Sequence, residues 1–142
     1  MASANAQFAR LYSPFSDFSR AFRDIADAIS LIGEFTSGMD SDGFCEDPRT
    51  IAAVERKLLV INEAAIRLGQ EAELRCPGPP WSEIRGIGNW LRHQYDAVEL
   101  PVVWKTVRDD LPPLKAAVLR TLAPPSDDST SLDSSPTSDF KK

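Results

Sequence analysis

The sequence predicts an all-α protein, built as an up-and-down bundle of four to five helices. Apolar residues recur at intervals of three and four along most of the chain, and no stretch alternates polar and apolar residues as a strand does. With 142 residues, of which 42% are apolar and 26% charged, the chain has the size and composition of one globular domain. We divide it into an N-terminal extension (1–17), a helical domain (18–122) and an acidic tail (123–142).

The first predicted helix begins at an N-cap, Ser16 or Asp17, and ends near Thr36. One face of it carries an apolar stripe at steps of four, three, four and three residues: Phe18, Phe22, Ile25, Ile29 and Ile32. A loop is predicted from Gly38 to Phe44, because this stretch is rich in aspartate and glycine.

The second predicted helix runs from about residue 48 to 72. Asp47 supplies an N-cap oxygen and Pro48 occupies the first helical position, where the missing N–H costs nothing. An apolar stripe follows at Ile51, Val54, Leu58, Ile61, Ala65 and Leu68. The proline-rich stretch at 76–80 ends this helical region.

A third helix is predicted from Trp81 onward, and it contains Gly86 and Gly88. Each glycine inside a helix costs about 1 kcal/mol relative to alanine, so we expect a close helix–helix approach or a ligand near the backbone. After a joint at 96–101 we expect a brief helix at 102–107. A last helix, capped by Asp109 or Asp110, ends near Leu122, and the tail beyond it is predicted to be disordered.

Charge and composition exclude several classes of protein. The net charge of −5 gives no overall basic field that would draw the chain onto nucleic acid or an anionic membrane. No apolar run approaches the roughly 20 residues that span a bilayer, and no secretory signal pattern is present, so we expect a cytoplasmic protein without membrane contact. Cys45 and Cys76 form no metal-binding pattern and there is only one histidine, so we expect free thiols and no metal site.

The single histidine, His93, lies in a segment, residues 86–96, that also contains an arginine and a tyrosine and could therefore form a catalytic site. Arg92 precedes it and Tyr95 follows two residues later. Histidine transfers protons near neutral pH, and arginine stabilises charge on phosphate oxygens, so the pair suits metal-free cleavage of RNA. The alternative is structural: a histidine at the edge of the core, a solvated arginine and a packed tyrosine.

Glu63 is predicted to adjoin the apolar stripe of the second helix, and Arg23 and Asp24 adjoin that of the first. One interpretation is interhelical ion pairing, for example of Glu63 with Arg56 or Arg92. The other is a supporting role, in which Glu63 orients His93 or the arginine.

Several short segments together resemble the HepT-like ribonucleases, a branch of the HEPN superfamily of small helical proteins. They occur in order over about residues 20–120: Arg23-Asp24-Ile25, Val54-Glu55-Arg56-Lys57-Leu58, Ile61-Asn62-Glu63-Ala64-Ala65, Pro80-Trp81-Ser82-Glu83-Ile84, Gly88-Asn89-Trp90-Leu91-Arg92-His93-Gln94-Tyr95 and Val103-Trp104. The extension and the acidic tail lie outside this resemblance.

The resemblance implies a metal-independent ribonuclease that needs no cofactor and acts as the toxin of a toxin–antitoxin pair. Such proteins form homodimers with the active cleft at the interface. His93 falls on the motif histidine and Tyr95 on the motif tyrosine, which a minimal nucleotidyltransferase antitoxin adenylylates. Asn89 is expected to orient the histidine or to contact RNA.

The sequence departs from the family motif at Gly88, where the family has an arginine. We hypothesise that Arg92 supplies the guanidinium instead, since positions 88 and 92 are one helical turn apart. Arg85, eight residues before His93, is the weaker candidate. The rival hypothesis is a weak or inactive helical interaction protein that dimerises and binds a nucleotidyltransferase.

Overall fold

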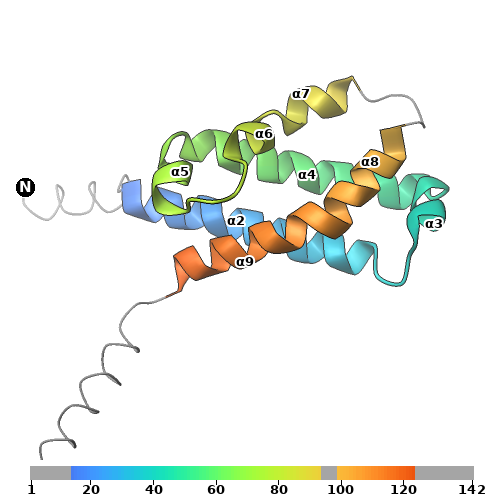
Figure 1. The fold of residues 1–142 in the computed structure, drawn as a ribbon, viewed down its shortest axis with the longest axis horizontal. Coiled ribbons are helices and arrows are strands. Elements are labelled where there is room, and N and C mark those ends of the chain that lie inside the picture. The colour runs from blue at the N-terminus through green and yellow to red at the C-terminus, as the bar shows by residue number, and fades with distance from the viewer. Residues whose placement is uncertain (1–13, 94–98, 124–142) are drawn as a thin grey trace, which may run out of the picture.

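A computed structural model describes residues 14–93 and 99–123. All regular structure within these residues is helical, which confirms the predicted all-α fold. Figure 1 shows long helices lying along one another, with shorter ones beside them. The predictions for Tyr95, for residues 1–13 and for the tail from 124 fall outside the described residues.

The bundle is built around two long helices, α2 and α4. The elements follow in the order α2 (Pro14–Phe35), α3 (Ser41–Cys45), α4 (Pro48–Leu68), α5 (Glu71–Arg75), α6 (Trp81–Arg85), α7 (Ile87–Arg92), α8 (Leu100–Lys105), the π-helical turn η2 (Thr106–Asp110) and α9 (Leu111–Leu122). The most extensive contact joins α2 to α4; α9 packs on α2, and α6 and α7 pack on α4. None of these helices, in the part of the chain described, is long and apolar enough to cross a membrane.

The predicted apolar stripes form the core. On α2 the residues Phe22, Ile25, Ile29 and Ile32 are buried, and on α4 they meet Val54, Leu58, Ile61, Ala65 and Leu68. Full burial of one such large side chain contributes about 1.5–3 kcal/mol. The two stripes therefore supply the main stabilisation that holds α2 against α4.

The start of α4 follows the predicted capping chemistry. The Asp47 carboxylate accepts hydrogen bonds from the backbone N–H of Thr50 (3.1 Å) and from its hydroxyl (2.9 Å). The bond from the Thr50 backbone, followed by the hydroxyl bond, lowers the pKa of the Asp47 carboxyl. The helix ends at Leu68, earlier than predicted, because Gly69 takes a left-handed φ of 57° and the chain turns into α5.

The loop predicted at 38–44 contains a short helix, α3. Asp40 caps it by accepting a hydrogen bond from the N–H of Gly43 at 2.8 Å. Phe44 is fully buried, and its ring lies 5.2 Å from that of Trp104 between centroids. This buried aromatic contact holds a helical turn in a stretch whose composition is typical of a loop.

The last two predicted helices are one continuous run, α8–η2–α9, and Asp110 makes no side-chain cap. The backbone widens at η2, where the N–H of Leu111 bonds to the carbonyl of Thr106, five residues back. Pro112 and Pro113 follow at once and donate no backbone hydrogen bond. The wide turn thus carries the helix past two prolines that would otherwise end it.

Candidate active site at the end of helix α7

The single helix predicted from Trp81 is divided at Gly86 into α6 and α7. The side-chain amide of Asn62, on α4, donates to the carbonyls of Ile84 (3.1 Å) and Arg85 (2.8 Å). Carbonyls at the end of a helix have no partner within the helix. Asn62 therefore stabilises the bend between α6 and α7 from a neighbouring helix.

Gly88 is buried where α7 approaches α4. A β-carbon at this position would lie 2.8 Å from Oδ1 of Asn62 and 3.8 Å from Cδ2 of Leu59. The Asn62 oxygen cannot turn aside freely, because the amide nitrogen of the same group holds two hydrogen bonds. Of the two explanations for the glycines, the close helix approach is therefore the one that applies at Gly88.

Three of the predicted site residues lie in the exposed part of the same segment. Asn89 and Arg92 are on α7, His93 is its C-cap, and all three side chains are exposed. Position 88 is instead turned toward α4. The segment thus presents an imidazole and a guanidinium to solvent, while position 88 packs against α4 and has no room for a longer side chain. Tyr95 lies outside the described residues.

The apolar pattern predicted Glu63 on the buried side of α4, and this prediction is wrong. The Glu63 side chain is exposed, and it makes no ion pair with another described residue. The ion pair between α2 and α4 joins Arg67 to Asp24, at 2.9 Å. The buried polar residue at this point is Asn62, which is only 6% exposed. Sequence reasoning missed Asn62, although a polar amide inside an apolar stripe was the available signal.

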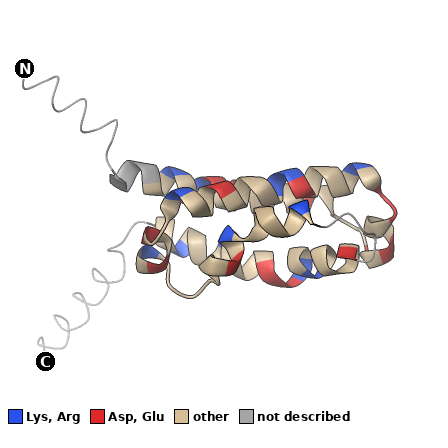
Figure 2. Cartoon of the chain, turned by 90° about the horizontal axis from the view of Figure 1, so that it is seen from above, with Lys and Arg blue, Asp and Glu red and all other residues tan. Residues whose placement is uncertain are grey.

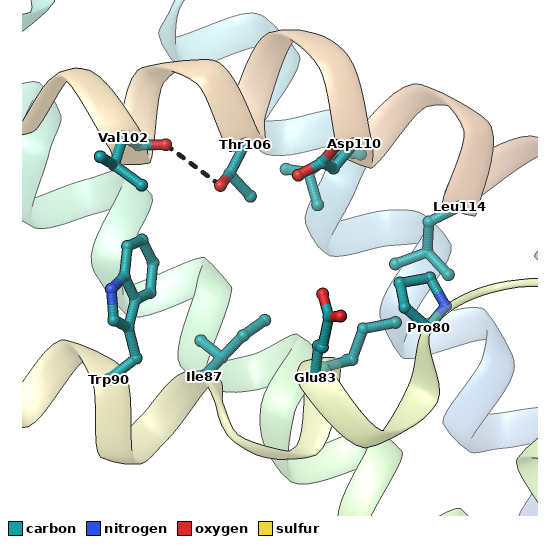
Figure 3. A pocket seen from close by; sticks show the side chains of 10 residues that line it. Pro80, Glu83, Ile87, Trp90, Val102, Thr106, Asp110 and Leu114 are labelled. Atoms are coloured by element: carbon teal, nitrogen blue, oxygen red, sulfur yellow. Dashed lines mark hydrogen bonds between the residues drawn. The ribbon is translucent and has the colours of Figure 1, made fainter.

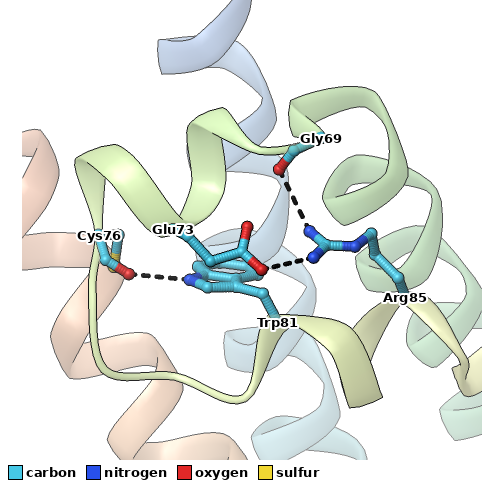
Figure 4. A network of polar contacts seen from close by, with 5 residues as sticks. All are labelled: Gly69, Glu73, Cys76, Trp81 and Arg85. Atoms are coloured by element: carbon cyan, nitrogen blue, oxygen red, sulfur yellow. Dashed lines mark hydrogen bonds and ion pairs between the residues drawn. The ribbon is translucent and has the colours of Figure 1, made fainter.

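Arg85 is part of a structural network (Figure 4). Its guanidinium donates to the carbonyl of Gly69 at 3.2 Å and forms an ion pair with Glu73. The hydrogen bond from Arg85 lowers the pKa of the Glu73 carboxyl. Arg85 thus ties the end of α6 to α5 and to the end of α4, whereas Arg92 is exposed on α7.

Glu55 lies on α4, one turn before Leu59, whose Cδ2 would lie 3.8 Å from a β-carbon at position 88. Figure 1 shows α7 running back along α4, so the end of α7 lies toward the half of α4 that carries Glu55. Burial raises the pKa of the Glu55 carboxyl. The folded chain therefore holds this proton more tightly than the unfolded chain, and the ionised carboxylate is a net cost at neutral pH.

We expect Glu55→Gln to raise the melting temperature at pH 7. The gain should disappear below about pH 4, where the wild-type carboxyl is itself protonated in both states. Glu63→Gln, an exposed carboxylate on the same helix, is the matched control and should change little. A melting temperature for Glu55→Gln at or below that of the wild type at pH 7 would contradict this account.

The charged residues do not segregate by sign. In the view of Figure 2, basic and acidic residues both recur along the helices. Within residues 14–93 and 99–123, no group of three or more histidine, cysteine, aspartate or glutamate side chains is placed to hold a metal ion. A binding site for a polyanion therefore has to be built locally, from residues such as Arg92.

Comparison with known proteins defines the class of this bundle. The family model described as "Ribonuclease HepT-like" matches residues 25–121, and the chain belongs to this family. It is 40% identical over 92 residues to a protein named probable ribonuclease HepT from Thermococcus cleftensis, covering 65% of this chain and 84% of that protein. It is 32% identical over 95 residues to a candidate RNase of Methanocaldococcus jannaschii, covering 67% and 87%. No solved structure matches the chain significantly.

Proposed function

We propose that the chain is a metal-independent endoribonuclease and the toxin of a toxin–antitoxin pair. The observation that carries the proposal is the exposed Arg92–His93 pair at the end of α7, in a chain that belongs to a ribonuclease family. Membership supports RNA cleavage in general, and the exposed pair supports these residues as the ones that perform it.

The reaction needs two proton transfers and one stabilised anion. His93 takes the proton of the 2′-hydroxyl, whose oxygen then bonds to phosphorus, and the bond from phosphorus to the 5′-oxygen breaks. The leaving 5′-oxygen gains a proton, so the products are a 2′,3′-cyclic phosphate and a 5′-hydroxyl. Arg92 stabilises the charge that develops on the phosphorus oxygens. Asn89, four residues before His93 on the helix, orients the imidazole or contacts the RNA.

The proposed active form is a homodimer. Each chain has one histidine, but the reaction uses a base at one oxygen and an acid at another. Two copies that meet along the ends of their α7 helices would bring two imidazoles and two guanidinium groups to one cleft. Pairing would also double the local positive charge in a chain whose net charge is −5.

The proposed regulator is a nucleotidyltransferase antitoxin that adenylylates Tyr95. This tyrosine is two residues after His93, so an attached AMP would add bulk and negative charge close to the imidazole. Both effects oppose the binding of an RNA phosphate. The proposed activity needs a compartment that holds both the RNA substrate and the antitoxin, so we propose a cytoplasmic location.

The direct test uses the purified, unmodified chain and a single-stranded RNA in the presence of EDTA. Cleavage that leaves 2′,3′-cyclic phosphate ends, and that is lost in His93→Ala, supports the proposal. Cleavage that EDTA abolishes, or that persists in a folded His93→Ala variant, would refute it.

We expect Arg92→Ala to lower kcat by about a hundredfold, the usual cost of one group that stabilises a transition-state anion. Arg92→Lys should recover only part of the rate, because an ammonium keeps the charge but not the planar fork. Arg56→Ala removes an exposed arginine from α4 and is the matched control. Unchanged cleavage in Arg92→Ala would show that this arginine does not replace the family arginine.

The lack of space for a side chain at Gly88 favours a second candidate function. Without the family arginine, the chain would be a helical interaction protein that dimerises and binds a nucleotidyltransferase with little or no cleavage. Failure of the folded, unadenylylated chain to cut RNA, together with retained dimerisation and binding to the nucleotidyltransferase, would establish this function.

A further inference from the structure

A groove of about 290 Å³ lies between α6–α7 and the run α8–η2–α9 (Figure 3). Its floor is apolar, formed by the buried side chains of Ile84, Leu111 and Leu114. Trp90 lines one side, and Val102, a large apolar side chain that is 46% exposed, lines the other. The groove is thus an apolar concavity beside the helix that carries Arg92 and His93.

Both charged groups among the described residues that line the groove are carboxylates, which only accept hydrogen bonds when ionised. Figure 3 shows the carboxylates of Glu83 and Asp110 pointing into it from opposite sides. The Thr106 hydroxyl donates its proton to the carbonyl of Val102 at 3.1 Å, so only its lone pairs are left for a ligand. Among the described residues that line the groove there is no lysine, arginine or histidine.

This chemistry disfavours two occupants. An RNA phosphate would be repelled by carboxylates on both sides. A second copy docked groove to groove about a twofold axis would set Glu83 and Asp110 against the same carboxylates, since such an interface is self-complementary. The groove instead suits a cation with several N–H donors and an apolar stem.

The geometry points to a docking site for an arginine side chain, presented among apolar residues by a different polypeptide. A guanidinium carries five donors in one plane and can bond to the carboxylates of Glu83 and Asp110 together, while its stem packs on Ile87. The indole of Trp90 adds a ring face for the cation. Thr106 and Asp110 both come from η2, and π-helical turns are frequent at functional sites. The site is independent of whether the chain cleaves RNA.

Nuclear magnetic resonance tests the site on the full chain with two peptides, acetyl-Leu-Arg-Leu-amide and the same peptide with citrulline. Citrulline has the shape of arginine but a neutral urea group. We expect the arginine peptide to shift the indole N–H signal of Trp90, with the signals of Trp81 and Trp104 unmoved. The citrulline peptide should bind about tenfold more weakly, the loss expected for a charge-assisted contact.

Glu83→Gln and Asp110→Asn should each weaken binding of the arginine peptide in folded protein. Asp109→Asn is the matched control: this carboxylate is exposed on η2, does not line the groove and lies 3.9 Å from Lys105. Equal binding of both peptides, or an equal loss in Asp109→Asn, would overturn the proposal. So would an oligouridine that shifts the Trp90 signal at a lower concentration than the arginine peptide.

Discussion

Trp81→Ala is expected to lower the free energy of unfolding by about 3–5 kcal/mol, the usual cost of truncating a buried tryptophan. Trp81 is 1% exposed, and its ring meets that of Phe22 edge to face, with 6.2 Å between the centroids. Its indole N–H donates to the carbonyl of Cys76 at 2.8 Å (Figure 4). The substitution therefore leaves a cavity against α2 and removes the bond that closes the 76–80 turn.

Chemical denaturation measures this loss, and Trp81→Phe separates its two parts. Phenylalanine retains much of the packing against Phe22 but cannot bond to the Cys76 carbonyl. We expect it to cost about 1–3 kcal/mol, the penalty for one buried acceptor left without its partner. If Trp81→Ala cost less than Trp81→Phe, the assigned packing role would be wrong.

Gly88→Arg is expected to destabilise the fold by about 3 kcal/mol or more and not to restore family-like activity. Overpacking a close contact usually costs about 1–3 kcal/mol, and an arginine adds far more than a methyl group. The position faces α4, where even a β-carbon would lie 2.8 Å from Asn62 Oδ1. A charged side chain entering there would have to displace Asn62 or move α7.

A double-mutant cycle locates the cause of this effect. Gly88→Ala should cost about 1–3 kcal/mol alone and clearly less in the Asn62→Ala background, because the clashing oxygen is then absent. Gly33→Ala is the control for alanine in place of glycine, since nothing lies within 4 Å of a β-carbon there. Equal costs of Gly88→Ala in both backgrounds, or a stable Gly88→Arg with raised cleavage, would contradict the close packing of Gly88 against Asn62.

Local patterns predicted the long helices well. The stripe from Phe22 to Ile32 and the Asp47–Pro48 start of α4 follow from spacing and capping chemistry within a few residues. The break at Gly86 could not be read in this way, because it depends on Asn62, more than twenty residues earlier. The passage of the last helix through Pro112 was also missed, since proline by itself indicates an end.

For the candidate site too, some features follow from local sequence patterns and others depend on packing between helices. Arg92 and His93 are both exposed, which fits the predicted catalytic role and the structural alternative alike, and this exposure comes from the packing of the bundle and not from the motif. Glu63 was placed wrongly, because an apolar stripe fixes the face of a helix only to within about one residue. The lack of space for a side chain at Gly88 could not be predicted, because it depends on residues of α4 and not on any pattern within residues 86–96.

We propose that His93 makes this chain an RNase toxin. The most direct test is to express the chain alone in a bacterial culture beside His93→Ala, and to follow growth and total RNA. We expect growth arrest and new RNA fragments with the wild-type chain, and neither with the folded variant. Normal growth and intact RNA with a folded, unadenylylated wild-type chain would contradict it.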